Sequence, residues 1–426
     1  MTDEGTLPTP GSEEPPTERF PSPLWAPAPP EIDGYRLLQR IGKGGMGEVW
    51  EAEQLEPIRR RVALKLIKPG MDTEQVIVRF EAERQALALM SHSAIARVLD
   101  AGATPGGRPY FVMELVRGEP ITRFCDRHRL TIHDRLELFL KVCDGVQHAH
   151  QNAVIHRDVK PSNVLVTYQD DRPVPKIIDF GIAKAVAGRL ADRTLFTRFG
   201  EFLGTPEYMS PEQLAGKDDV DTRTDVYALG VMLYELLAGT LPHDASRLRE
   251  LGPEDLRRRL LESEPPRPST RLSRLGAESD TAATNRSTEP RRLVSLLEGD
   301  LDWIVGKAME KDRVRRYASV SELAADVRRH LDDEPVLAGA PGAGYRLGKF
   351  ARRHRGPLLA AGLVVLVLLG GILGTTLGLL RARAEAREAR TQAAIAQAVN
   401  AFLNDDLLAA VSPEEQGRDV SMREVL

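Results

Sequence analysis

The uncharged run at residues 358–380 constrains this chain more than any other part of its sequence. It consists of leucine, valine, isoleucine, alanine and glycine with two threonines, and it contains no Asp, Glu, Lys or Arg. A helix of about 20 apolar residues crosses the hydrocarbon core of a bilayer. A buried core helix fits less well, because the run has no polar face and is longer than typical core helices. The sequence therefore predicts one transmembrane helix over 358–380.

The segments on either side of this run differ in character. Residues 1–33 are acidic and rich in proline, without an apolar run, so we expect a disordered leader. Residues 332–357 are expected to form a juxtamembrane linker, and residues 381–426 a helical segment beyond the membrane. The net charge of −4 gives no reason to expect a nucleic-acid partner. Two cysteines without a CxxC pattern exclude a disulfide framework.

The region between leader and linker changes from strands to helices along the chain. Such a change indicates an α+β fold of two lobes, with an N-lobe at 35–116 and a C-lobe at 117–331, rather than an alternating doubly wound sheet. Residues 262–292 are rich in Pro, Ser, Thr and Arg and are expected to form a loop. Periodicity predicts two strands joined by glycines over 35–53, further strands at 61–67 and 109–115, and helices at 73–90, 132–151, 225–238, 301–309 and 319–331.

A glycine-rich segment lies between the first two expected strands. Glycines let the backbone approach phosphate oxygens closely, and their N–H groups can point at the anion. GxGxxG alone is a weak signal, since it also marks dinucleotide-binding folds, but there a helix follows and here a strand follows. The segment comprises Ile41, Gly42, Lys43, Gly44, Gly45, Met46, Gly47, Glu48 and Val49.

Lys65 ends the next apolar strand, where its ammonium could contact the phosphates of a nucleotide. Most lysines at the end of an apolar strand are simply solvated. The position of Lys65 just after a glycine hairpin is what favours a phosphate-binding role. Glu83 on the following helix could pair with Lys65. Glu81 is its local rival, and Glu83 is preferred because of its spacing to the apolar face of that helix.

The strongest chemical signal is the segment 156–163, which reads HRDVKPSN. Asp158 can accept the proton of an attacking hydroxyl, Lys160 can neutralise charge on a transferred phosphoryl group, and Asn163 can ligate Mg²⁺. Asp179 follows an apolar strand and supplies a second Mg²⁺ ligand. Residues 204–212, reading GTPEYMSPE, close the segment that begins at Asp179.

Together these motifs resemble those of the eukaryotic-type protein kinase superfamily, in its bacterial Ser/Thr branch. The resemblance extends from Tyr35 to Leu331 and implies a bilobal kinase fold, ATP as the phosphate donor, and Mg²⁺ or Mn²⁺ as the metal. Two departures are Ser210 in the element that usually reads Ala-Pro-Glu, and Ser93 where proline usually follows histidine. Neither position touches the chemistry.

The resemblance also implies roles for residues around the nucleotide. Met113 would be the gatekeeper at the end of the hinge strand. Asp225 would brace the catalytic loop from a buried helix, and Glu212 would pair with Arg316. Adenine would be sandwiched by Ile41, Val49, Ala63 and Leu165 and would bond the backbone of Glu114 and Val116.

Specificity and regulation follow from the same resemblance. Lys160 and Thr205 are typical of Ser/Thr kinases, so protein Ser and Thr hydroxyls are the expected substrates. Arg157 precedes the catalytic Asp and could bind a phosphate on the segment before residue 204. The candidate regulatory threonines are Thr194, Thr197 and Thr205. Autophosphorylation is expected at Thr197, with Thr194 second, although ordinary loop threonines would look the same.

Two other functions compete with an active protein kinase. A pseudokinase scaffold would need to lack Lys65, Asp158, Asn163 or Asp179, and all four are present. A small-molecule phosphotransferase of the same broad fold is disfavoured by residues 204–212, which resemble a peptide-binding element.

The expected location is the cell (inner) membrane, crossed once. Basic residues lie on both sides of 358–380, so charge alone does not decide the orientation. The need for ATP decides the orientation, and it places the kinase domain in the cytoplasm.

Gly370, Gly374 and Gly378 are spaced for close helix packing in a homodimer. Glycine is also common in membrane helices, and both interpretations fit the sequence.

Overall fold

The computed structural model describes residues 31–44, 47–68, 90–180, 205–216, 219–244, 248, 250–339 and 342–403. It divides into two compact units, Met1–Pro341 and Gly342–Leu426. Each unit is described by itself.

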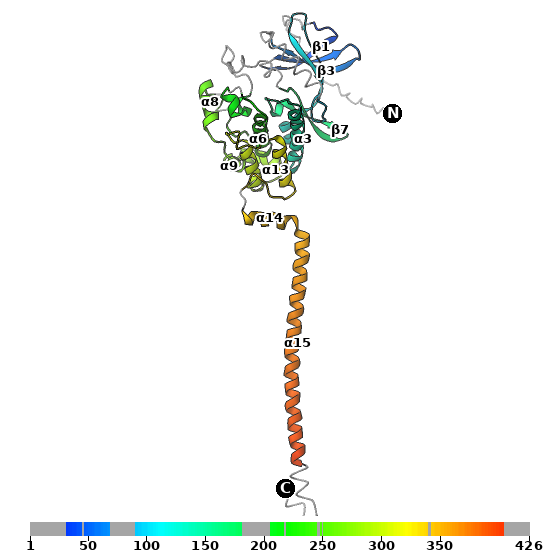
Figure 1. Ribbon diagram of the computed structural model, residues 1–426, viewed down its shortest axis with the longest axis vertical. Coiled ribbons are helices and arrows are strands. Elements are labelled where there is room, and N and C mark those ends of the chain that lie inside the picture. The colour runs from blue at the N-terminus through cyan, green and yellow to red at the C-terminus, as the bar shows by residue number, and fades with distance from the viewer. Residues whose placement is uncertain are drawn as a thin grey trace, which may run out of the picture. The chain divides into compact units, whose positions relative to one another are not determined.

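A five-stranded antiparallel sheet forms the first lobe of the first unit (Figure 1). Its spatial order is β1-β2-β3-β5-β4. Side chains alternate between the two faces of β3, so Val62 and Leu64 enter a small core on one face, whereas Ala63 faces the main core of the unit. The strands are β1 (Tyr35–Gly44), β2 (Gly47–Gln54), β3 (Arg60–Ile67), β4 (Val98–Ala103) and β5 (Pro109–Glu114).

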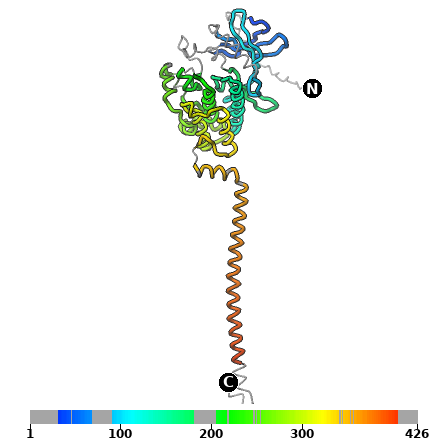
Figure 2. Tube along the Cα trace, viewed as in Figure 1, coloured from blue at the N-terminus to red at the C-terminus, as the bar shows by residue number. Residues whose placement is uncertain are grey.

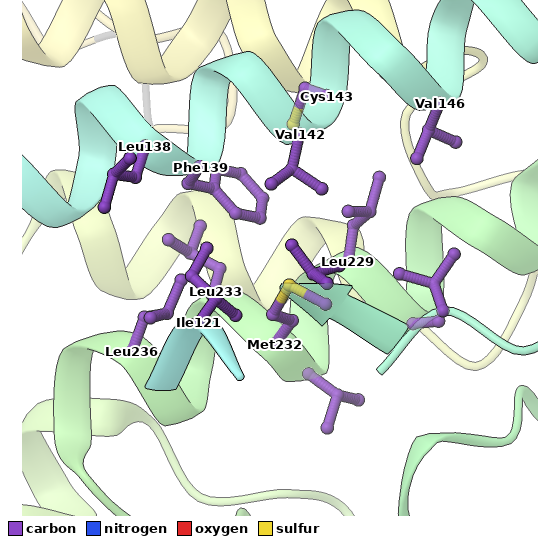
Figure 3. Packing of buried hydrophobic residues seen from close by; sticks show 14 of the residues in the cluster. Ile121, Leu138, Phe139, Val142, Cys143, Val146, Leu229, Met232, Leu233 and Leu236 are labelled. Carbon is purple, nitrogen blue, oxygen red and sulfur yellow. The ribbon is translucent and has the colours of Figure 1, made fainter. Parts of the chain in front are cut away.

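Two long helices, α3 (Ile132–Gln151) and α6 (Arg223–Ala238), form the centre of the second lobe. Their apolar side chains interdigitate, with Phe139 and Val142 of α3 facing Leu229 and Met232 of α6 (Figure 3). Nearly every residue of α6 is buried, and most of these buried residues are apolar, on nearly all sides of the helix. A reciprocal cap between Thr131 and Asp134 starts α3.

Shorter elements complete the second lobe, whose helices run from blue-green to yellow in Figure 2. A three-stranded sheet of order β6-β7-β8 lies next to the catalytic loop. The expected two-lobed α+β architecture is therefore confirmed. These elements are α2 (Ile121–Arg127), η1 (Pro161–Asn163), η2 (Pro206–Tyr208), α5 (Pro211–Leu214), α12 (Asp300–Ala308), α13 (Val320–Leu331), β6 (Glu119–Pro120), β7 (Val164–Gln169) and β8 (Arg172–Ile177).

The expectation of a loop over residues 262–292 is wrong. After α8 (Pro253–Glu262), this stretch holds α9 (Pro268–Arg274) and α10 (Glu278–Thr284), and it runs into α11 (Pro290–Leu297). Pro268 and Pro290 occupy the first turn of their helices, where the missing N–H has no intrahelical partner to lose. The prolines that suggested a loop therefore begin helices, and buried side chains such as Leu272 and Leu293 hold these helices in the core.

A buried carboxylate holds the last residues of the first unit in place. Asp326 on α13 accepts hydrogen bonds from the hydroxyl of Tyr317 (2.9 Å) and from the backbone amides of Leu337 and Ala338, both at 2.8 Å. One residue later, a Cβ on Gly339 would lie 2.5 Å from the ring of Trp303, so only glycine fits there. The chain therefore leaves this unit from a fixed point.

Over residues 342–403, the part of the second unit that the structure describes, the chain forms two helices, α14 (Ala343–Arg353) and α15 (Arg355–Ala401) (Figure 1). The uncharged run lies wholly within α15, and its large apolar side chains, such as Leu366 and Leu369, are exposed. This helix is long and apolar enough to cross a membrane. One long apolar helix after the two lobes agrees with the expectation from sequence.

Two glycines give a matched test of core packing in the second lobe. A Cβ on Gly230 of α6 would lie 2.8 Å from the Cβ of Ala308, whereas a Cβ on Gly306 of α12 would meet nothing within 4 Å. We expect Gly230→Ala to lower the free energy of unfolding by about 1–3 kcal/mol. Gly306→Ala should raise it by roughly 0.5–1 kcal/mol through helix propensity. Thermal unfolding of the detergent-solubilised chain measures both, and equal effects would contradict this account.

Candidate functional site

The loop between α3 and β7 brings together the three polar residues predicted to carry the chemistry. The ammonium of Lys160 lies 2.8 Å from Oδ2 of Asp158. Nδ2 of Asn163 donates to the same carboxylate at 3.1 Å and to the backbone carbonyl of Asp158 at 2.8 Å. One cation and one amide therefore orient the carboxylate of Asp158.

Asp225 holds the backbone of this loop from α6. Its side chain is fully buried and accepts hydrogen bonds from the amides of His156 and Arg157, each at 2.8 Å. Nε2 of His150 lies 2.7 Å from the same carboxylate. Burial would raise the pKa of Asp225, but the bonds from His150 and the amides hold its pKa below the ordinary value. The bracing role expected for Asp225 is confirmed.

Arg157 has a backbone conformation that non-glycine residues rarely adopt, with φ of 62°. Such a residue costs on the order of 1–3 kcal/mol unless its surroundings determine it. Here both neighbouring peptide groups are fixed, because Asp225 accepts from the Arg157 amide and Nε2 of Gln213 donates to the Arg157 carbonyl at 2.9 Å. The strained turn sets the direction in which the chain enters Asp158.

His156 links the catalytic loop to the strand that leads to Asp179. Its Nδ1 accepts from the amide of Asp158 (3.3 Å), and its Nε2 donates to the carbonyl of Ile178 (3.2 Å). These partners require a neutral ring protonated at Nε2. Burial lowers the pKa of His156, which agrees with that state. The sequence motif contained His156, but sequence reasoning assigned it no role, because its partner lies 22 positions away.

Lys65 on β3 and Asp179 after β8 meet as an ion pair. Both side chains are shielded from water, with exposures of 9% for Lys65 and 28% for Asp179. Asp179 has φ of 63°, a conformation that aspartate adopts more readily than most residues. The predicted partner of Lys65, Glu83, lies outside the described residues, as does its rival Glu81.

The glycine segment forms the hairpin between β1 and β2. Gly44 is paired with Gly47, and Gly42 with Val49. A Cβ on Gly47 would lie 2.2 Å from the carbonyl oxygen of Leu66, so the close approach of β2 to β3 requires glycine here. Gly45 and Met46, at the tip of the predicted phosphate cradle, lie outside the described residues.

Three of the residues predicted to surround adenine share one cluster. Ala63 is paired with Met113 across β3 and β5, and both belong to the main core, against which Val49 packs. Ile41 is exposed and lies on β1, while Leu165 lies on β7 in the other lobe. Glu114 ends β5, and its amide donates to the carbonyl of Arg97 at 2.9 Å.

Asn163 and Asp179 fit the demands of a magnesium ion. Nδ2 of Asn163 is directed at Asp158, so the amide oxygen of Asn163 points away from that carboxylate. Asp179 offers a carboxylate beside Lys65. Within the described ranges, no three His, Cys, Asp or Glu side chains form a metal cage. Mg²⁺ retains waters and is commonly bound by one or two protein oxygens together with phosphates, so it does not need such a cage.

The pair of Glu212 on α5 and Arg316 is also confirmed. The guanidinium donates twice, from Nη1 to Oε1 and from Nη2 to Oε2, both at 2.7 Å. Thr224 donates to Oε1 at 2.9 Å. Both charges are buried, and the fork geometry satisfies them. Burial would raise the pKa of Glu212, but the bonds from Arg316 keep it below its ordinary value of 4.5.

The predicted regulatory threonines Thr194 and Thr197 lie outside the described residues. The structure resumes at Thr205, which precedes η2 and accepts from the amide of Tyr208 through its carbonyl (3.2 Å). The hydroxyl of Tyr208 contacts Glu235 on α6. This short segment is therefore attached to the same central helix as the catalytic loop.

Comparison with known proteins identifies relatives for the first unit. Residues 35–315 match the family described as the protein kinase domain. The chain is 38% identical over 67% of its length to the serine/threonine-protein kinase Pkn1 of Myxococcus xanthus. It is 34% identical over 72% of its length to the serine/threonine-protein kinase PknB of Mycobacterium tuberculosis. The matches span only 37% and 44% of those two proteins.

A solved structure shows the same architecture. The kinase domain of Mycobacterium tuberculosis PknI superimposes with a TM-score of 0.50 at 26% identity. The superposition covers 70% of this chain and 97% of that domain.

Neighbouring arginines test the buried pair. Arg316→Met leaves the Glu212 carboxylate buried without its partner, so we expect a loss of roughly 3–5 kcal/mol in unfolding free energy. Arg315→Met is the control, because Arg315 is 71% exposed and its partner Glu310 is 3.9 Å away. We expect the control to change stability by less than about 1 kcal/mol. Chemical denaturation at neutral pH measures both, and a similar loss in the two variants would contradict the assignment.

The same pair predicts a pH dependence. Because the pKa of Glu212 is lower in the folded state than its ordinary 4.5, the carboxylate stabilises the fold above that value. This contribution is lost as the pH falls through the folded-state pKa. The stability difference between wild type and Arg316→Met should therefore narrow below about pH 4.5, and a constant difference would argue against an ionised Glu212.

Proposed function

The chain belongs to the protein kinase family, and from that premise we propose that it is a non-specific serine/threonine protein kinase using ATP. The observation that carries the proposal is the arrangement around Asp158, whose carboxylate contacts Lys160 and Asn163 in a loop fixed by Asp225. Phosphoryl transfer depends on positioning and electrostatic stabilisation, and this arrangement offers both.

In the proposed reaction, the hydroxyl oxygen of a Ser or Thr side chain attacks the γ-phosphorus of ATP. The bond between that phosphorus and the β–γ bridging oxygen breaks, and ADP leaves with the bond's electron pair. Asp158 accepts the hydroxyl proton, while Lys160 offsets negative charge on the transferred group. The contact between Lys160 and Asp158 supports this division of roles, because it brings both groups to one point.

We further propose that Lys65 binds the α- and β-phosphates, and that Asn163 and Asp179 hold Mg²⁺, with Mn²⁺ as a substitute. When bound, the metal would neutralise charge on the phosphate oxygens. The ion pair of Lys65 with Asp179 supports this assignment, because one group that suits phosphate and one that suits a cation lie side by side. Glu83 is proposed to hold Lys65 in place.

Nucleotide binding is assigned to the glycine hairpin and the apolar cluster near β5. The hairpin residues 41–49 would cover the phosphates. Val49, Ala63 and Met113, with Ile41 and Leu165, would line the adenine site, and Glu114 and Val116 would bond the adenine edge. The clustering of Val49, Ala63 and Met113 supports this assignment.

The domain boundaries of the proposal are those expected from the sequence: a leader at 1–33, a kinase domain at 35–331, a linker at 332–357, a membrane helix at 358–380 and an extracytoplasmic segment at 381–426. We propose that the kinase domain is cytoplasmic, at the inner membrane, because ATP is found there. The exposed apolar surface of α15 supports a membrane span. Gly370, Gly374 and Gly378 support weak homodimerisation through that helix.

A nucleotide-binding scaffold without transfer activity is the competing function. It is disfavoured because Asp158, Asn163 and Lys65 are all present and the described contacts of each suit catalysis.

Labelling with ATP tests the activity. We expect purified full-length chain with Mg²⁺ to phosphorylate itself and a Ser/Thr protein substrate. Asp158→Asn should reduce the rate by roughly 10²–10⁴-fold, since it removes the proton acceptor. Asp170→Asn is the matched control, because Asp170 is exposed at a turn with φ of 50° that asparagine adopts easily, and it should retain full activity. Nucleotide binding without transfer by wild type would favour the scaffold.

Phosphopeptide mapping of the same reaction tests regulation. Thr197 should carry the main autophosphorylation site and Thr194 the second, with Arg157 as the partner of the phosphate. Finding both threonines unmodified in fully active protein would remove this part of the proposal.

A further inference from the structure

The helix α14, which precedes the apolar helix, has two chemically different faces. Leu347 and Phe350 lie three residues apart on one side, with exposures of 68% and 53%. At 100° per residue, the buried Lys349 falls roughly opposite this side, whereas Arg346 and Arg353, both exposed, flank the apolar side. Exposed large apolar side chains beside cations are the pattern of helices that lie in a membrane interface.

The charge around α14 has one sign. From Pro335 to Ala384 the chain contains no Asp or Glu, while Arg346, Lys349, Arg352, Arg353 and Arg355 are all cationic. Cationic segments next to a membrane span are attracted by acidic phospholipid headgroups, with about 1 kcal/mol for each Lys or Arg near the surface. The composition therefore indicates that an anionic surface would attract this helix.

A break in the helix separates α14 from α15 next to the uncharged run. His354 has φ of −109° and ψ of 34°, which ends α14, and α15 begins at Arg355 with Pro357 in its first turn. Proline is tolerated in a first turn, whereas a continuous helix would lose a hydrogen bond there and bring the proline ring against the preceding turn. Because the uncharged run starts only five residues after Arg353, α14 must lie close to the headgroups wherever α15 crosses the bilayer.

We propose that α14 is an interfacial helix that binds the acidic phospholipids of the cytoplasmic leaflet. This inference rests on the proposed membrane span. Leu347 and Phe350 insert at the boundary between headgroups and acyl chains, and Arg346 and Arg353 contact the phosphates. Continuity with α15, whose uncharged run begins five residues after α14 ends, identifies the occupant of this face as the bilayer.

Spin labels on the full-length chain can measure the depth of α14. The two native cysteines are buried, and burial raises the pKa of the Cys125 thiol to about 11 and that of Cys143 further, so labelling reports introduced cysteines. Leu347→Cys carries the test label. Leu337→Cys carries the control label, because Leu337 has the same exposure of 68% but lies outside α14. Vesicles are made of phosphatidylcholine, alone or mixed with phosphatidylglycerol.

We expect the label at 347 to lose access to a water-soluble nickel chelate in the mixed vesicles, and the label at 337 to keep its access in both. Combined Arg346→Gln and Arg353→Gln changes should lower the ratio of docked to undocked helix by roughly tenfold or more in mixed vesicles. Both results would support the proposal. Equal access at 347 and 337 in mixed vesicles, or docking at 347 that does not depend on phosphatidylglycerol, would overturn it.

A third label separates this proposal from its premise. Leu366 lies in the middle of the uncharged run and is 69% exposed in the absence of lipid. A label at Leu366→Cys that is reached by oxygen but not by the nickel chelate establishes the span, so that the result at 347 then tests α14 alone. Access of the chelate to this label would overturn the membrane span and the interfacial helix together.

Discussion

The buried carboxylate of Asp225 is the constraint on which the catalytic loop depends. It accepts two backbone amides of that loop and lies next to His150, so one side chain fixes a turn whose own backbone conformation is unfavourable. Without these bonds, Arg157 would have little reason to adopt its left-handed conformation. The orientation of Asp158, one residue further, follows from that turn. A buried side chain on a separate helix thus helps to set the orientation of Asp158.

The helix that carries Asp225 also takes part in other polar contacts of the second lobe. Thr224 bonds to Glu212, which forms the buried pair with Arg316, while Glu235 contacts Tyr208. Because α6 is apolar on nearly all sides, its position is set by packing against α3 and α12. The polar contacts then hold the catalytic loop and the segment after residue 205 in place relative to this helix. Packing makes the helix rigid, and the polar contacts of a few buried side chains attach the catalytic loop and the segment after residue 205 to it.

The sequence predicted the lobes, the main strands and the residues around Asp158, because these depend on local periodicity and on short motifs. It failed at residues 262–292, where proline and serine suggested a loop although Pro268 and Pro290 begin helices. It also gave no role to His156, and it did not foresee the contact of Lys65 with Asp179, which joins positions 114 apart in the chain. Such contacts depend on tertiary packing, which residue spacing does not encode.

The chain leaves the first unit at a fixed point, Ala338 and Gly339, and this limits how far the first unit can move from a membrane. Between Ala338 and Leu358 the chain can reach at most about 50 Å, since α14 advances only about 1.5 Å per residue and the remainder at most about 3.6 Å. If α15 crosses the bilayer, the first unit is confined to a thin layer next to that surface. Such tethering gives membrane-bound proteins an effective concentration in the millimolar range without any added contact. Encounters with any partner held at the same surface would then depend on diffusion in two dimensions.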